Sequence, residues 1–150
     1  MNKWCAVVLW FLFSSEIFGT VRTAEENLQT AVLIIKSQLM AFYTNHQRAN
    51  PSRVLTRVGD LTVKMVGTKH KPKCKTKGAE TFGMALFLTS MLQTYSARLG
   101  SAGKRLERAG SALLRLVEIW ASCGRVMDAA ARQPAFDPVY HTHVTPPTHS

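Results

Sequence analysis

The sequence predicts an all-α protein with one compact helical domain, and three observations support this fold class. The composition is that of a single globular domain, with 150 residues, of which 46% are hydrophobic and 19% charged. Two long segments carry apolar residues at three- and four-residue steps, the spacing of one helix face, and a third is apolar on nearly every side. Strand-like alternation is confined to the short stretch 53–66.

The N-terminal segment, residues 1–19, has the three-part layout of a secretory signal peptide. A basic residue precedes an unbroken apolar run from Trp4 to Phe13, and small and polar residues follow. The run has ten residues, whereas a membrane-spanning helix needs roughly 17–25, so we expect no membrane span. Cleavage is expected after Gly19 or after Thr23. The alternative, an ordinary core helix or strand, is disfavoured because the run has neither caps nor periodicity.

The first long helix of the mature chain is expected from Ala24 to about Arg48. Thr23 is a candidate N-cap, and two glutamates in the first turn, Glu25 and Glu26, suit the positive end of the helix dipole. Asn50-Pro51 ends the pattern. The apolar face consists of Leu28, Ala31, Val32, Ile35, Leu39 and Phe42.

The connection that follows is expected to hold a short β element. Residues 53–58 and 61–66 contain β-branched side chains in partial alternation about Gly59-Asp60, which indicates one strand or a short hairpin. Residues 67–78 are expected to form an unpacked basic loop. Its five lysines are Lys69, Lys71, Lys73, Lys75 and Lys77.

Two further helices are expected, at 79–99 and at 104–123, separated by a break at Gly100–Gly103. The first is apolar on nearly every side and is expected to be the most buried element. The second is amphipathic. Its predicted apolar stripe is Leu106, Ala109, Leu113, Val117 and Trp120.

The helical bundle is therefore assigned to residues 24–128 and an extended or disordered tail to residues 133–150. The tail contains four prolines and shows no apolar periodicity. Three histidines lie in it, but solvated histidines are favoured there over a metal site.

The sequence shows no converging set of catalytic groups. The nine acidic residues are dispersed, and neither a glycine-rich phosphate loop nor a metal-ligand motif is present. We therefore expect a protein that is not an enzyme and that uses no cofactor and no metal.

The net charge of +10 favours anionic partners. The lysine-rich loop has the charge density of a binding site for sulfated glycans of the heparan type, and a solvated loop is the alternative. Nucleic acid is disfavoured because the loop has no aromatic residue. Three arginines of the last helix, Arg105, Arg108 and Arg115, are either a solvated face or anchors for an acidic protein partner.

Cleavage of the N-terminal segment would remove Cys5 and leave Cys74 and Cys123 in an oxidising compartment, where thiols normally pair. A bond within one chain would close a loop of about 50 residues and stabilise the fold by on the order of 4 kcal/mol. A bond between two chains would make a covalent homodimer. Both arrangements remain open.

The chain resembles the short-chain four-helix cytokines, most closely the interleukin-5 group and, as second choice, the interleukin-4 and interleukin-13 group. The resemblance rests on Leu61–Val66 with the basic loop, on Cys74 before Glu80-Thr81-Phe82, and on Arg105-Leu-Glu-Arg108 followed by Cys123-Gly-Arg125. It covers residues 24–125. It implies a secreted cytokine with growth-factor activity that binds class I receptors on immune cells.

The resemblance also implies roles for single residues. A glutamate on the first helix, Glu26 or else Glu25, would contact the shared receptor subunit, and Arg125 would contact the private one. The two cysteines would form a disulfide, between chains as in interleukin-5 or within one chain as in interleukin-4.

The segment after Met127 departs from the family, because the expected fourth helix is absent or reduced to residues 126–132. Such a bundle would leave apolar surface exposed. Two alternatives therefore accompany the cytokine hypothesis: a cationic host-defence or glycosaminoglycan-binding protein, and an orphan or truncated helical protein without signalling activity.

Overall fold

The computed structural model describes residues 1–19 and 23–123 of the chain, and helices make up most of this part. Its helices are α1 (Asn2–Ser14), α2 (Ala24–Ala49), α3 (Val63–Val66), α4 (Gly78–Thr94) and α5 (Ser96–Ser122). No strand occurs among these residues, so the predicted all-α class is confirmed.

The chain divides into two units, residues 1–117 and residues 118–150. The described residues of the second unit, 118–123, comprise the end of α5 and a turn, with Ile119 and Trp120 exposed. All packing described below lies within residues 1–117.

Helix α2 agrees closely with the sequence prediction. The Thr23 hydroxyl accepts a hydrogen bond from the Glu26 backbone N–H at 3.3 Å, and the Glu26 carboxylate accepts one from the Thr23 N–H at 3.1 Å. This reciprocal pair satisfies two donors at the helix start. The buried residues of α2 are Ala31, Val32, Ile35, Leu39 and Tyr43.

Helix α4 is the most buried helix of the described chain, as predicted. Its start is capped by the Glu80 carboxylate, which accepts a hydrogen bond from the Lys77 backbone N–H at 2.8 Å. The helix ends at Thr94, five residues before the predicted end. Its buried residues are Thr81, Gly83, Met84, Ala85, Phe87, Leu88, Thr89, Met91 and Leu92.

The predicted β element in 53–66 is wrong. Val63–Val66 form one helical turn instead. A strand needs a neighbouring strand to pair with its backbone groups, whereas here local partners take that role. The Tyr43 hydroxyl accepts a hydrogen bond from the Val58 N–H at 3.3 Å, and the Thr62 carbonyl accepts one from the Met65 N–H at 3.0 Å.

The predicted break at Gly100–Gly103 is present as a kink at Gly100, between two helical stretches that together make up α5. Gly100 has φ 61° and ψ −155°, a conformation that residues with a Cβ rarely adopt, and helical structure continues on both sides. α5 therefore begins at Ser96 and not at residue 104. The predicted apolar stripe is wrong at two positions, because Ala109 and Trp120 are exposed, while Gly110 is buried in their place.

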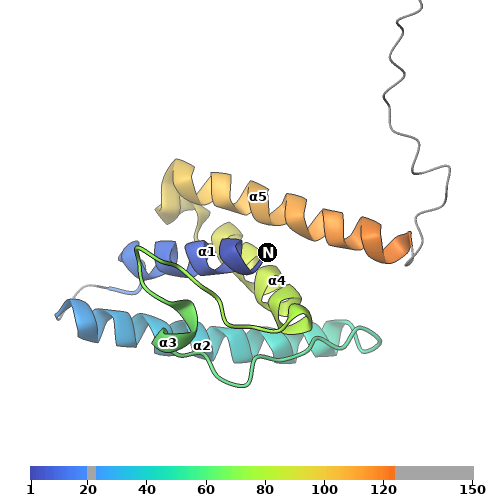
Figure 1. Cartoon of the computed structure of the whole chain (residues 1–150), viewed down its shortest axis with the longest axis horizontal. Coiled ribbons are helices and arrows are strands. Elements are labelled where there is room, and N and C mark those ends of the chain that lie inside the picture. The colour runs from blue at the N-terminus through green and yellow to red at the C-terminus, as the bar shows by residue number, and fades with distance from the viewer. Residues whose placement is uncertain (20–22, 124–150) are drawn as a thin grey trace, which may run out of the picture. The chain divides into compact units, whose positions relative to one another are not determined.

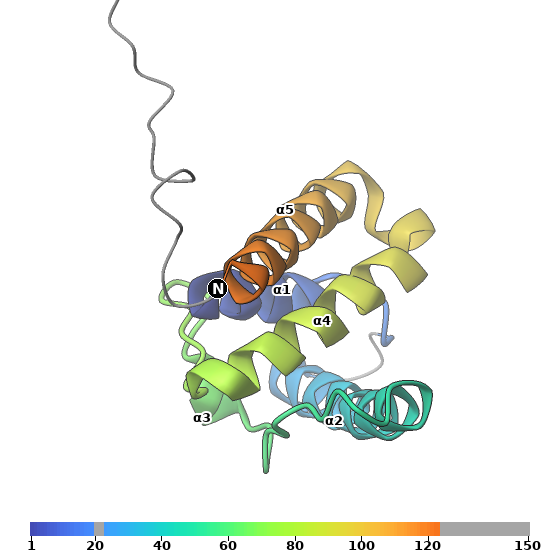
Figure 2. The ribbon, with the colours of Figure 1, turned by 90° about the vertical axis from the view of Figure 1, so that its right-hand side faces the viewer.

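The N-terminal segment forms α1 and lies in the core of the described chain. Figures 1 and 2 show α1 between α2 and the part of α5 that precedes Glu118, with α4 running across it. Five α1 side chains are fully shielded from solvent: Cys5, Ala6, Val8, Leu9 and Leu12. The expected cleavage between residues 19 and 23 stays a prediction, and it would remove this buried helix.

Candidate binding surfaces

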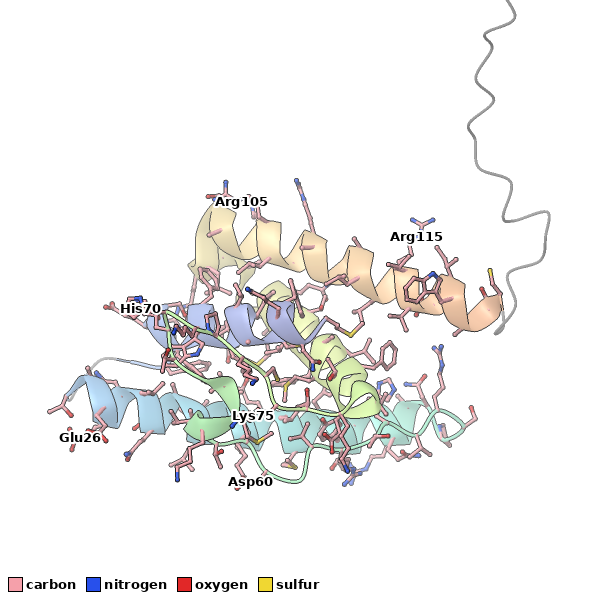
Figure 3. The ribbon with its side chains drawn as sticks, in the orientation of Figure 1. Glu26, Asp60, His70, Lys75, Arg105 and Arg115 are labelled. Atoms are coloured by element: carbon pink, nitrogen blue, oxygen red, sulfur yellow. The ribbon has the colours of Figure 1, made fainter. Side chains whose placement is uncertain are left out.

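The basic residues of α5 form an exposed face, as the sequence predicts. Arg105, Arg108 and Arg115 are all exposed, and the stick view shows Arg105 and Arg115 pointing away from the neighbouring helices (Figure 3). Arg108 and Arg115 lie about two helical turns apart, roughly 10 Å along the axis. They therefore share one side of the helix.

These arginines have no ion-pair or hydrogen-bond partner among the described residues. Glu107, the acidic residue nearest in sequence to Arg105 and Arg108, is occupied elsewhere, because its Oε1 accepts hydrogen bonds from the Gln93 side-chain amide and the Ser111 hydroxyl, each at 3.0 Å. The guanidinium groups are thus available for a carboxylate supplied by another molecule.

The two glutamates assigned to a receptor contact lie at the start of α2. Both Glu25 and Glu26 are exposed. The Glu26 carboxylate, however, is a helix cap and also accepts a hydrogen bond from the Thr23 hydroxyl at 2.9 Å. The structure brings neither glutamate together with the arginines, which lie on α5 (Figure 3).

The lysine-rich segment is more ordered than the sequence suggests. Its five lysines are exposed, but the residues between the last four alternate inward: Pro72 and Thr76 are half-buried and Cys74 is buried. In an extended chain, alternate residues lie on the same side about 7 Å apart. The ammonium groups from Lys71 to Lys77 therefore form a row about 20 Å long.

Backbone hydrogen bonds hold this row in place. The Lys73 N–H donates to the Val66 carbonyl and the Lys75 N–H to the Met65 carbonyl, both at 3.0 Å. Gly67 turns the chain with φ 69°, and a Cβ there would lie 2.6 Å from the Lys71 carbonyl oxygen. A glycine is therefore required at the start of the turn. The expectation of an unpacked loop is wrong.

Helix α1 also forms hydrogen bonds with the lysine-rich segment. The Trp10 indole N–H donates to the Val66 carbonyl at 2.9 Å, and the Asn2 side-chain amide donates to the Thr76 carbonyl at 3.3 Å. Residue 76 is thus fixed to the start of α1 and residue 66 to its second half. Sequence reasoning missed these supporting residues, because it treated the N-terminal segment only as an apolar run.

The two cysteines predicted to pair lie in different surroundings. Cys74 is buried and Cys123 is exposed, and both are free thiols in this structure. Burial raises the pKa of the Cys74 thiol. The disulfide between these residues stays a prediction, as does the disulfide-linked homodimer.

Several predicted features lie outside the described residues. These are Arg125, the fourth helix at 126–132, the end of the predicted bundle at residue 128 and the tail 133–150.

The described residues contain no cluster of three or more His, Cys, Asp or Glu side chains placed to hold a metal ion. A groove of about 260 Å³ between α2 and α4 is lined by apolar and uncharged polar side chains, including Phe42, Phe87 and Met91. Gln38 and Tyr95 are hydrogen-bonded to each other there at 3.1 Å. None of its lining residues is acidic or basic.

Among the helices of residues 1–19 and 23–123, none combines the length and the apolar character that crossing a membrane requires. The chain matches no protein-family model, no curated protein and no solved structure.

Proposed function

We propose that the protein is a secreted helical ligand of the cytokine type, which binds a class I receptor on immune cells and signals without catalysing a reaction. The observation that carries this proposal is the exposed basic face of α5, defined by Arg105, Arg108 and Arg115. Arginine on a rigid helix can form two parallel hydrogen bonds with a carboxylate, which suits an acidic receptor surface.

A charge reversal on this face tests the proposal. We expect Arg108→Glu combined with Arg115→Glu to lower binding of the labelled protein to leukocytes by about tenfold or more, because each favourable pair becomes a repulsion. Cell-surface binding and phosphorylation of receptor-associated signalling proteins are the measurements. Circular dichroism checks that both proteins are equally helical.

The matched control is Arg48→Glu combined with Arg53→Glu, two exposed arginines outside α5. It changes the net charge by the same amount. Equal losses in both double variants would show that binding follows net charge only, and unchanged binding in the α5 variant would exclude this face as the receptor contact.

A second candidate function, binding of a sulfated glycan, is favoured by the regular row of lysines. Four exposed ammonium groups at two-residue steps on a hydrogen-bonded segment match a linear polyanion better than scattered charges do. Such binding depends strongly on salt, since each neutralised anion releases a counterion.

Replacing Lys73, Lys75 and Lys77 together by glutamine should lower the salt concentration at which the protein elutes from immobilised heparin. We expect the slope of log affinity against log salt to decrease by about two to three, one for each lost contact. Replacing the exposed Arg48, Arg53 and Lys104 together by glutamine is the charge-matched control. An equal shift in the control would refute a defined site in the 71–77 row.

Treating the cells with heparinase distinguishes the two functions. Receptor binding should survive the removal of heparan chains and should persist in part at about 0.5 M salt, whereas glycan binding should be lost in both conditions.

A further inference from the structure

Helix α1 is fitted to the rest of the chain by directional contacts and not only by apolar burial. The Trp4 indole N–H donates to the Leu106 carbonyl at 3.2 Å, and the Arg98 guanidinium donates to the Ile17 carbonyl at 3.1 Å. At Gly110, an added Cβ would lie 2.4 Å from the Trp4 ring. A targeting segment needs a basic start, an apolar run and small residues near the cleavage site, but no directional contacts with the rest of the chain. These contacts therefore indicate a helix that belongs to the folded protein.

The contacts of α1 also place two cysteines in one part of the core. The Asn2 side chain is hydrogen-bonded to the Thr76 carbonyl and to the Thr81 hydroxyl. The Thr81 and Thr76 hydroxyls are 2.8 Å apart, and the Thr76 hydroxyl is 3.5 Å from the Cys74 sulfur. A continuous series of polar contacts thus joins Asn2 to Cys74.

Cys5 lies on the face of α1 that contacts this series. It follows Asn2 by three residues and so occupies the same helix face one turn later. Both Cys5 and Cys74 belong to the buried core cluster, with exposed fractions of 0% and 5%. Burial raises the pKa of the Cys5 thiol to about 12, and the neighbouring Cys74 adds to the rise.

We propose that residues 1–19, which include α1, are retained in the mature protein and that Cys5 is the disulfide partner of Cys74. The bond would join α1 covalently to the lysine-rich segment and would leave the exposed Cys123 for a bond between chains. This arrangement replaces the predicted Cys74–Cys123 bond. Its occurrence in cells rests on the proposed secretion, but its formation in vitro does not.

The chemistry is thiol–disulfide exchange with a small-molecule disulfide such as oxidised glutathione. One cysteine loses its proton, attacks the glutathione disulfide and forms a mixed disulfide, which releases one glutathione as its thiol. The second cysteine then loses its proton, attacks the mixed disulfide and releases the second glutathione. Two protein thiols are oxidised and one glutathione disulfide is reduced to two thiols.

The high pKa of Cys5 determines when this exchange takes place. Burial raises the pKa of the Cys5 thiol and shields both Cys5 and Cys74 from the oxidant, whereas Cys123 is exposed. The reduced, folded protein should therefore react at Cys123 first. The bond between Cys5 and Cys74 forms during folding, while both thiols still contact water.

The first experiment is refolding of the complete chain in a glutathione redox buffer, followed by alkylation and tryptic mapping without reductant. The lysine and arginine positions place the three cysteines in peptides 4–22, 74–75 and 116–125. We expect a linked pair of 4–22 and 74–75. A linked pair of 74–75 and 116–125, or three alkylated cysteines, would overturn the proposed bond.

Two variants make the result specific. Cys123→Ser should keep the linked pair, and Cys5→Ala should abolish it while leaving Cys74 alkylated. If Cys5→Ala fails to fold, Cys123→Ser alone still decides, because only one pair of cysteines remains in it.

The second experiment is the intact mass of the protein collected from the medium of a secreting host cell. A mass that includes residues 1–19 supports retention, and a chain beginning between residues 20 and 24 refutes it. Neither result bears on the arginine face of α5, so failure of this inference and failure of the receptor proposal are distinguishable.

Discussion

Replacing Gly110 by alanine is expected to destabilise the folded chain by about 2 kcal/mol. The added methyl group would lie 2.4 Å from the Trp4 ring and 2.6 Å from the Thr89 hydroxyl oxygen, so the helices that carry them must move apart. Alanine is better than glycine in a helix by about 1 kcal/mol, and the loss of packing should exceed that gain. Urea unfolding followed by circular dichroism measures the difference.

Two comparisons identify the cause. Gly78→Ala is the control, because no atom lies within 4 Å of its added Cβ, and it should leave the stability unchanged or slightly raised. In a Trp4→Ala background the cost of Gly110→Ala should fall by about 1 kcal/mol, since the methyl group then occupies space left by the ring. A stabilising effect of Gly110→Ala in the complete chain would contradict the packing of α1 against α5.

Replacing Leu9 by alanine is expected to cost about 3 kcal/mol of unfolding free energy. Leu9 is fully buried in α1, and truncation of such a side chain loses both its transfer free energy and the packing around the cavity. The measurement is the denaturation midpoint of the complete chain.

Val7→Ala serves as the matched control on the same helix. Val7 is 37% exposed, so its truncation should cost less than about 1 kcal/mol. Both variants keep the N-terminal segment apolar, so both proteins should enter the secretory pathway equally well. Equal midpoints for the two variants would mean that α1 does not form part of the folded core.

Helix α2 was predictable because its signals are local. A capping pair, Thr23 and Glu26, marks its start, a continuous apolar stripe marks its buried face, and Asn50-Pro51 marks its end. The same holds for α4, whose apolar character on all sides predicted burial. The residues within each of these two helices are therefore enough to predict where the helix begins and ends to within a few residues.

The structural role of α1 could not be predicted, because a signal peptide and a fully buried helix share the same apolar pattern. What separates them is the position of Trp4 against Gly110 and of Trp10 against Val66, and the two members of each pair are far apart in sequence. The prediction of a β element was wrong for a related reason. β-branched residues such as Val63 and Val66 favour strands only where a partner strand exists.

The binding surfaces were predictable in charge but not in geometry. Counting charged residues found the arginines of α5 and the lysines of 69–77. It did not reveal that Glu107 is held by Gln93 and Ser111, nor that Pro72, Cys74 and Thr76 point inward and thereby align the lysines. Both facts depend on contacts between separate elements of the fold.

The hydrogen-bonded indoles of α1 allow the docking of this helix to be followed by tryptophan fluorescence. The chain has three tryptophans. Trp4 and Trp10 are half-buried in α1, and Trp120 is 62% exposed. Indole emission shifts with solvent contact, so in a chain with Trp120→Phe the tryptophan emission would come only from α1. The docking of this helix could then be followed in real time during folding, without any attached label.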